Sequence, residues 1–213
     1  MKKGLMGFVF VSSLFLTACT FGDSTESQLT DVLSNVYEQE KGYRDAQTEL
    51  AKLEKEEQTT FNQVMELTQK DKEQVTKLAG ELEASVSKRV TLIEQESNSM
   101  ENAETSLSGF EDILKESKDD ESKVLKELRT ALEARYESHE NVSKEYLVLT
   151  ELQQKLYDLL PKEETEQAVL QEQVVLVNEQ NEKVQSAIES FNDSTKEVNE
   201  LKKTVYSTLS SEK

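Results

Sequence analysis

Apolar residues recur at alternating spacings of three and four along four long runs of the sequence. This spacing keeps one apolar stripe on one face of an α-helix, and a stripe that continues over many turns is typical of helices that pack as in coiled coils. Run by run, the stripe residues are Leu29, Val32, Val36, Tyr43, Ala46, Leu50 and Leu53; Ala79, Leu82, Val86, Ile93, Met100, Ala103, Leu107, Phe110 and Leu114; Leu125, Leu128, Leu132, Val142, Tyr146, Leu149 and Leu156; and Leu170, Val174, Val177, Val184, Ile188, Phe191, Val198, Val205 and Leu209. The runs predict an all-α protein.

Short segments without apolar side chains separate the first three runs. Residues 68–73 and 117–122 contain no apolar residue, and we expect a turn in each. No Gly or Pro lies in 68–73, so a continuous helix through this segment is the alternative. In 117–122, Asp119 or Asp120 is a candidate N-cap of the following helix.

Pro161 separates the third run from the fourth. Proline pushes the preceding residue out of the helical region, and it is tolerated at the first position of a helix. We therefore expect the third helix to end before Pro161 and the fourth to begin with it. Glu163 and Glu164 would then face the positive end of the fourth helix.

Similar run lengths, roughly 40 to 48 residues or about 60 to 70 Å as helices, favour antiparallel neighbours. We predict an elongated up-and-down antiparallel bundle of four long helices, or of three if the first two are fused, as a single domain over residues 28–213. The chain has one Pro and six Gly, too few turn-forming residues for a many-stranded β-fold. Pairing of the long amphipathic helices between two chains remains open.

The first nineteen residues have the pattern of a bacterial lipoprotein signal peptide. A positive start at Met1-Lys2-Lys3 precedes an apolar run over residues 4–16, and Leu16-Thr17-Ala18-Cys19 matches the L-x-[A/G]-C lipobox. The alternative is an ordinary signal peptide that ends near a cysteine. Because the only cysteine of the chain stands at the lipobox position, we expect residues 1–18 to be cleaved and Cys19 to carry a diacylglyceryl group.

A lipid on Cys19 would anchor the protein in the cell membrane on its extracytoplasmic face. Two acyl chains are enough for stable anchoring, whereas a single chain binds only marginally. Residues 19–27 combine the lipidated cysteine with a stretch rich in Gly, Ser, Thr and acid, and we expect a flexible tether there.

Composition excludes several classes of function. With 25 Lys+Arg against 43 Asp+Glu, the chain has a net charge of −18, which disfavours nucleic-acid binding because phosphate contacts need Lys and Arg. A single Cys cannot form an intrachain disulfide, and one Cys with one His cannot make a Cys/His zinc site. Phosphate-binding glycine loops and nucleophile elbows are absent from the sequence, so we expect no cofactor.

His139, the only histidine, occupies a stripe position of the third run. It could bind a metal with Glu133, Glu137 or Glu140, although bundle di-metal sites use two Glu-x-x-His pairs on different helices. A buried polar layer that fixes the register of the helices is the preferred interpretation, and we expect no metal and no catalytic residue. The polar positions of the fourth run that would complete such a layer are Asn181 and Thr195.

The lipobox, a Glu/Lys/Gln-rich helical body and a Ser/Thr-rich tail over residues 204–213 together resemble the YkyA family of Gram-positive lipoproteins, which is named for cell-wall binding. The resemblance covers essentially the whole chain. It implies an elongated helical bundle, attachment to the outer face of the cytoplasmic membrane and a role at the wall. It brings no catalytic residues, so only Cys19 is carried over.

We therefore expect a non-enzymatic binding or scaffold protein at the membrane–cell-wall interface. The alternative is a hydrolase or an accessory factor of cell-wall turnover that uses a carboxylate such as Glu137 with His139. The negative charge would repel anionic wall polymers and an anionic leaflet within a Debye length of about 8 Å. Besides the membrane, the candidate partners are peptidoglycan or wall polymers, reached through bridging cations, and a basic protein.

Overall fold

The computed structural model describes residues 24–68 and 70–211. These residues form the helices α1 Thr25–Gln39, α2 Lys41–Glu66, α3 Lys72–Thr105, α4 Phe110–Glu116, α5 Asp119–Leu159 and α6 Gln167–Ser211, with a short 3₁₀ helix, η1, at Ser106–Gly109 between α3 and α4. No strand is present among them, and the all-α prediction is confirmed.

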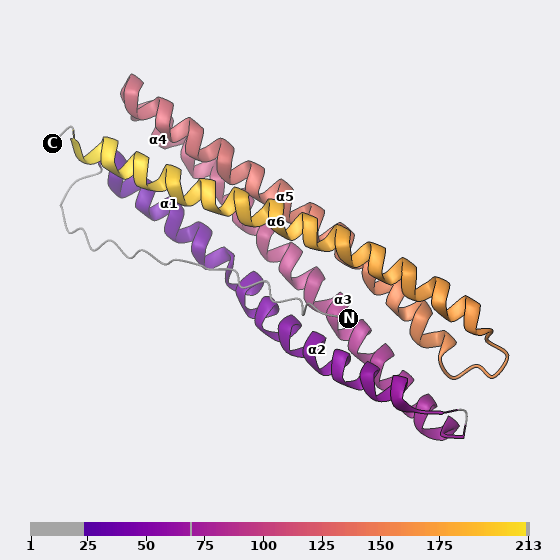
Figure 1. Cartoon of the computed structure of the whole chain (residues 1–213). Helices are drawn as coiled ribbons and strands as arrows, with labels where there is room; N and C mark the ends of the chain where they lie inside the picture. The colour runs from indigo at the N-terminus through magenta and orange to yellow at the C-terminus, as the bar shows by residue number, and fades with distance from the viewer. Residues whose placement is uncertain (1–23, 69, 212–213) are drawn as a thin grey trace.

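The helices form four antiparallel rods arranged as two hairpins (Figure 1). α1 and α2 make the first rod, and α3, η1 and α4 make the second; α5 and α6 are the third and fourth. The most extensive helix contacts join α2 with α3, α3 with α5, and α5 with α6, and α1 also contacts α3, α4 and α6. The four-helix bundle is therefore confirmed, and the alternative of three helices with the first two fused is wrong.

Both hairpin turns lie at one end of the bundle, and the start of α1, α4 and the end of α6 lie at the other (Figure 1). The two tips are close together, because Lys72 Nζ is 2.6 Å from Glu163 Oε1 across the gap between the hairpins. We call the end with the turns the tip end and the opposite end the α1 end.

The predicted stripes line the core. One apolar cluster at the α1 end includes Leu29, Phe110, Leu128 and Val205, and a second towards the tip end includes Leu82 and Val184. All six of these residues are buried. Gln, Glu and Lys occupy most of the outer faces, as the amphipathic pattern requires.

The ends of the first two rods differ in detail from the sequence prediction. The Ser24 side chain accepts a hydrogen bond from Ser27 N at 3.2 Å, so α1 begins at Thr25 and residues 25–27 belong to the helix rather than to the predicted tether. The turn after α2 needs no Gly or Pro, because the Asp71 carboxylate accepts hydrogen bonds from Thr68 N and Oγ1 at 2.9 and 2.8 Å. These bonds lower the pKa of Asp71.

The predicted starts of α5 and α6 need correction. Lys118, rather than Asp119 or Asp120, is the N-cap residue of α5, and the Glu121 carboxylate satisfies the Lys118 backbone N–H at 3.1 Å. Pro161 does not begin α6. Residues 160–166 form the loop between the hairpin arms, closed by a bond from Thr165 Oγ1 to the carbonyl of Leu159 at 3.2 Å, so Glu163 and Glu164 lie in this loop.

Gly109 allows the first two rods to approach closely. A Cβ atom at position 109 would lie 2.6 Å from Val32 Cγ2, whereas a Cβ at Gly80, inside α3, would meet nothing within 4 Å. The rigid, β-branched side chain of Val32 has little freedom to move aside.

We therefore expect opposite effects from alanine at these two glycines. Gly109→Ala should lower the free energy of unfolding by about 1 to 3 kcal/mol through overpacking, and Gly80→Ala should raise it by about 0.5 to 1 kcal/mol through helix propensity. Urea unfolding followed by circular dichroism measures both. Equal effects of the two substitutions would contradict the close approach at Gly109.

Candidate functional site

Three layers of buried polar side chains interrupt the apolar core. Each joins the hairpin of α1–α4 to the hairpin of α5 and α6, and we name them by their central residues: the Glu40 layer, the His139 layer and the Arg89 layer. They follow one another from the middle of the bundle towards the tip end. A buried charge is costly without a partner, so each layer is a specific set of contacts.

The Glu40 layer lies where α1 passes into α2. Arg135 on α5 donates from Nη1 to Glu40 Oε1 at 2.6 Å and from Nε to Thr195 Oγ1 on α6 at 3.0 Å. The Tyr136 hydroxyl donates to the same Glu40 oxygen at 2.9 Å. Burial raises the pKa of Tyr136 and lowers that of Lys202 nearby. Glu40 thus holds the junction of two helices against α5.

The His139 layer contains the only imidazole of the chain. His139 Nε2 lies 2.6 Å from Glu96 Oε1 on α3, and Gln47 Nε2 on α2 donates to Glu96 Oε2 at 2.8 Å. The rings of Tyr43 and Phe191 meet the imidazole edge-on, each with a centroid distance of 5.4 Å. The side chains of His139 and Glu96 are 3 and 1 % exposed. All four rods therefore contribute to this layer.

The carboxylates that a metal or a hydrolytic site would use do not contact His139 among the described residues. Glu133 pairs with Arg129 at 2.9 Å, and Glu137 is exposed on the outer side of α5. Across residues 24–68 and 70–211, no three or more His, Cys, Asp or Glu side chains are grouped so that they could hold a metal ion. His139 therefore pairs with Glu96 across the core rather than with a neighbour on its own helix.

The two polar positions expected on α6 are not brought to His139. Thr195 accepts from Arg135 in the Glu40 layer. Asn181 is half-buried, and its side chain makes no hydrogen bond among the described residues. The predicted polar layer thus exists, but it is completed by residues of α2 and α3.

The Arg89 layer was missed by the sequence analysis. Arg89 on α3 donates to Glu57 Oε1 on α2 at 2.8 Å and to the Tyr146 hydroxyl on α5 at 2.9 Å. Tyr157 donates to Glu57 Oε1 at 2.7 Å, and Tyr146 donates to Glu54 Oε1 at 2.6 Å. Glu57 Oε2 and Arg89 Nε are buried without a hydrogen-bond partner among the described residues.

A signal for this layer was present in the sequence. Arg89 and Glu96 follow Leu82 at intervals of seven residues, so they occupy heptad positions on the apolar stripe of the second run. Glu57 lies seven residues after Leu50 and so occupies a stripe position of the first run. Charged residues at core positions predict buried polar contacts.

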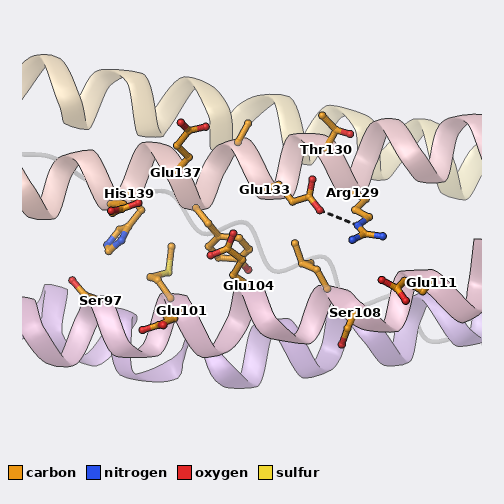
Figure 2. A pocket seen from close by; sticks show the side chains of 15 residues that line it. Ser97, Glu101, Glu104, Ser108, Glu111, Arg129, Thr130, Glu133, Glu137 and His139 are labelled. Carbon is orange, nitrogen blue, oxygen red and sulfur yellow. Dashed lines mark hydrogen bonds and ion pairs between the residues drawn. The ribbon is translucent and has the colours of Figure 1, made fainter.

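A groove of about 1000 Å³ opens between α3 and α5, in the half of the bundle nearer the α1 end (Figure 2). We call it the α3–α5 groove. Met100, Leu107 and Tyr136 form buried parts of its lining, and His139 also lines it. The acidic residues that line it are Glu101, Glu104, Glu111, Glu133, Glu137 and Glu140, and its one basic residue is Arg129.

The acidic residues of the groove repel one another. Burial raises the pKa of Glu104, and the charges of Glu133, Glu140 and Glu101 raise it further. The groove can therefore accept positive charge, and it has the size of a binding cleft for a small ligand or a peptide segment.

Comparison with known proteins gives the class of the protein and then its family. A long helical bundle of this kind is found in a crystal structure of a conserved protein of unknown function from Staphylococcus aureus, with a TM-score of 0.75 and 17% identity over 85% of this chain and 91% of that one. This likeness shows the fold alone. The family model described as "YkyA: Putative cell-wall binding lipoprotein" matches residues 24–208.

The chain belongs to this lipoprotein family. It is also 30% identical to the uncharacterized lipoprotein YkyA of Bacillus subtilis (strain 168) over 205 residues, which cover 94% of this chain and 90% of the relative. Within the described part of the chain, none of the helices contains a stretch apolar and long enough to cross a membrane.

The His139 layer makes a sharp prediction about stability. Glu96→Ala removes the partner of a buried imidazole and should lower the free energy of unfolding by about 3 to 5 kcal/mol. The double variant Glu96→Leu/His139→Leu replaces both polar groups and should cost clearly less. Urea unfolding of both variants checks this. A double variant as unstable as Glu96→Ala would show that packing, not pairing, decides the layer.

The raised pKa of Glu54 leads us to expect that the stability of the protein depends on pH. Burial raises this pKa, and the hydrogen bond from Tyr146 and the charge of Arg89 only partly oppose the shift. A raised carboxyl pKa contributes stability that is complete below the unfolded pKa of about 4.3 and is lost as pH rises through the folded pKa. Glu54→Gln removes this loss while it keeps an acceptor for Tyr146.

The difference in unfolding free energy between Glu54→Gln and the wild type should therefore shift in favour of the variant from pH 4 to pH 7. Thermal or urea unfolding at both pH values measures it. Glu56→Gln, exposed on the same helix, is the matched control and should show little change. A shift in the opposite direction would contradict the charge burial at Glu54.

Proposed function

We propose that the protein is a lipid-anchored, extracytoplasmic and non-enzymatic binding or scaffold protein at the membrane–cell-wall interface. The observation that carries this proposal is the lipobox Leu16-Thr17-Ala18-Cys19, with the only cysteine of the chain at the lipidated position. The lipobox lies outside the described residues. Membership of a lipoprotein family described by cell-wall binding supports the same location.

The proposed lipid anchor would lie near one end of the bundle, the α1 end. Six residue steps separate Cys19 from Thr25, where α1 begins, and they reach at most about 21 Å. The lipid would therefore hold the α1 end close to the membrane. α6 has 45 residues, about 68 Å, so the tip end can reach well into the wall region. The net charge of −18 favours this upright arrangement, because an anionic membrane surface would repel an acidic bundle lying along it.

The contacts of the ionisable core residues support a binding role rather than catalysis. Acid–base chemistry needs groups that reach a substrate, but His139 is bonded to Glu96 in the core, and Arg89 and Arg135 bind Glu57 and Glu40. The hydrolytic alternative would pair Glu137 with His139, and no contact of this kind supports it. What remains open to solvent is a groove and long helical faces.

Membrane anchorage is tested by fractionation. In cells of a Gram-positive host, the wild-type protein should sediment with the membranes and partition into the detergent phase. Cys19→Ala should appear mainly in the soluble or secreted fraction. Retention of Cys19→Ala in the membranes at the wild-type level would contradict lipid anchorage.

Wall binding is tested separately, with purified sacculi from which detergent has removed the membranes. Direct wall binding predicts that the purified protein sediments with the sacculi. If the protein stays in the supernatant while the fractionation result holds, the scaffold role toward proteins is the version of the proposal that stands.

A further inference from the structure

The two rods that line the α3–α5 groove carry rows of polar side chains with matching spacing. In Figure 2, Glu104 and Glu133 lie between the rods, whereas Thr130 and Glu137 extend from the side of α5 away from α3. Both rows follow the same spacing of three, four and three residues, which places each row on one face of its rod. The rows extend over about 15 Å. On one wall the row is Glu101, Glu104, Ser108 and Glu111, and on α5 it is Thr130, Glu133, Glu137 and Glu140.

Most of this negative charge is not neutralised within the protein. Arg129 pairs with Glu133, and Lys144 pairs with Glu140 at 2.7 Å. The carboxylates of Glu101, Glu104, Glu111 and Glu137 have no ion pair among the described residues. An occupant that brings positive charge would relieve their repulsion.

The side of the groove nearest the core is tied together by His139. Its ring lines the groove, and its Nε2 lies 2.6 Å from Glu96 Oε1 on α3, so this contact joins α5 to α3. The contact therefore helps to set the distance between the two walls that an occupant would meet.

The remaining lining fits the stems of long basic side chains. Ala134 gives the lining exposed apolar surface, and Met100, Leu107 and Tyr136 lie almost fully buried behind it. Lys and Arg bury their methylene stems on such surface while their charged heads stay near acidic groups. An anionic wall polymer would instead meet repulsion along both walls.

We infer that the α3–α5 groove binds a basic peptide segment of a partner protein, with Lys or Arg side chains lying between the two acidic rows. This inference rests on the proposed function, because it names the class of partner that the anchored bundle would hold. The groove lies nearer the α1 end, so the partner segment would bind in the membrane-proximal half.

The test uses the full mature protein in detergent and a labelled 14-residue helical peptide of Lys and Leu, with its Glu counterpart as the negative probe. Fluorescence anisotropy at two salt concentrations measures affinity. The groove variant is Glu101→Gln/Glu104→Gln/Glu137→Gln. The matched control is Glu49→Gln/Glu56→Gln/Glu66→Gln, which makes the same charge change at exposed positions of α2.

We expect the Lys peptide to bind, the groove variant to weaken binding at least tenfold, and the control to change it less than twofold. Circular dichroism verifies that both variants keep their helical content. Equal losses in the two variants, or no binding of the Lys peptide to the wild type, would overturn the inference. So would sedimentation with sacculi that only the groove variant loses, because the occupant would then be a wall polymer.

Fractionation keeps the two proposals distinguishable. If the protein is anchored through Cys19 but both triple variants bind the Lys peptide like the wild type, the groove inference fails and the proposed function stands. If wild-type protein and Cys19→Ala fractionate alike, the proposed function fails, whatever the groove binds in detergent.

Discussion

Buried charge is the constraint on which the architecture depends. Glu96 and Glu57 lie in the core and Glu40 is half-buried at its edge, and each reaches a cation or imidazole on a helix at 2.6 to 2.8 Å. An apolar stripe tolerates a shift of one helix along another, but a buried carboxylate that loses its partner is strongly destabilising. The three layers therefore fix how the hairpin of α1–α4 aligns with the hairpin of α5 and α6, and hence the width and lining of the groove between α3 and α5.

The predicted lipid anchor and the groove lie in one half of the bundle, and the hairpin tips lie at its other end. The α1 end is where the predicted lipid would lie, and the groove opens in the same half, while the hairpin tips extend away from it (Figure 1). A net charge of −18 makes close contact with anionic wall polymers unfavourable, yet it suits a basic protein segment. The proposed role thus depends on the position of the groove and on its charge.

Much of the fold was predictable, because apolar residues at the helical period mark the face of each helix that is buried. The stripe residues Leu29, Leu82 and Val184 are all buried, and the turn near residue 68 follows the gap in the stripe. The polar layers were only partly predictable. His139 stood out as the single histidine, but its partner Glu96 lies 43 residues away, and such pairing depends on the register between rods rather than on local sequence. The helix ends were missed for another reason, because they depend on local hydrogen bonds such as those of Glu121 with the Lys118 N–H and of Thr165 with the Leu159 carbonyl.

The most direct test of the account is site-specific photo-crosslinking in living cells, with a photoreactive amino acid at Ser108 in the groove and, as control, at Glu66 on α2. The account predicts a protein adduct in the membrane fraction from position 108 and not from position 66. It also predicts that the Lys and Leu peptide, added to cells after removal of the wall, suppresses that adduct. Adducts of equal yield from both positions, or an adduct that the peptide leaves unchanged, would contradict it.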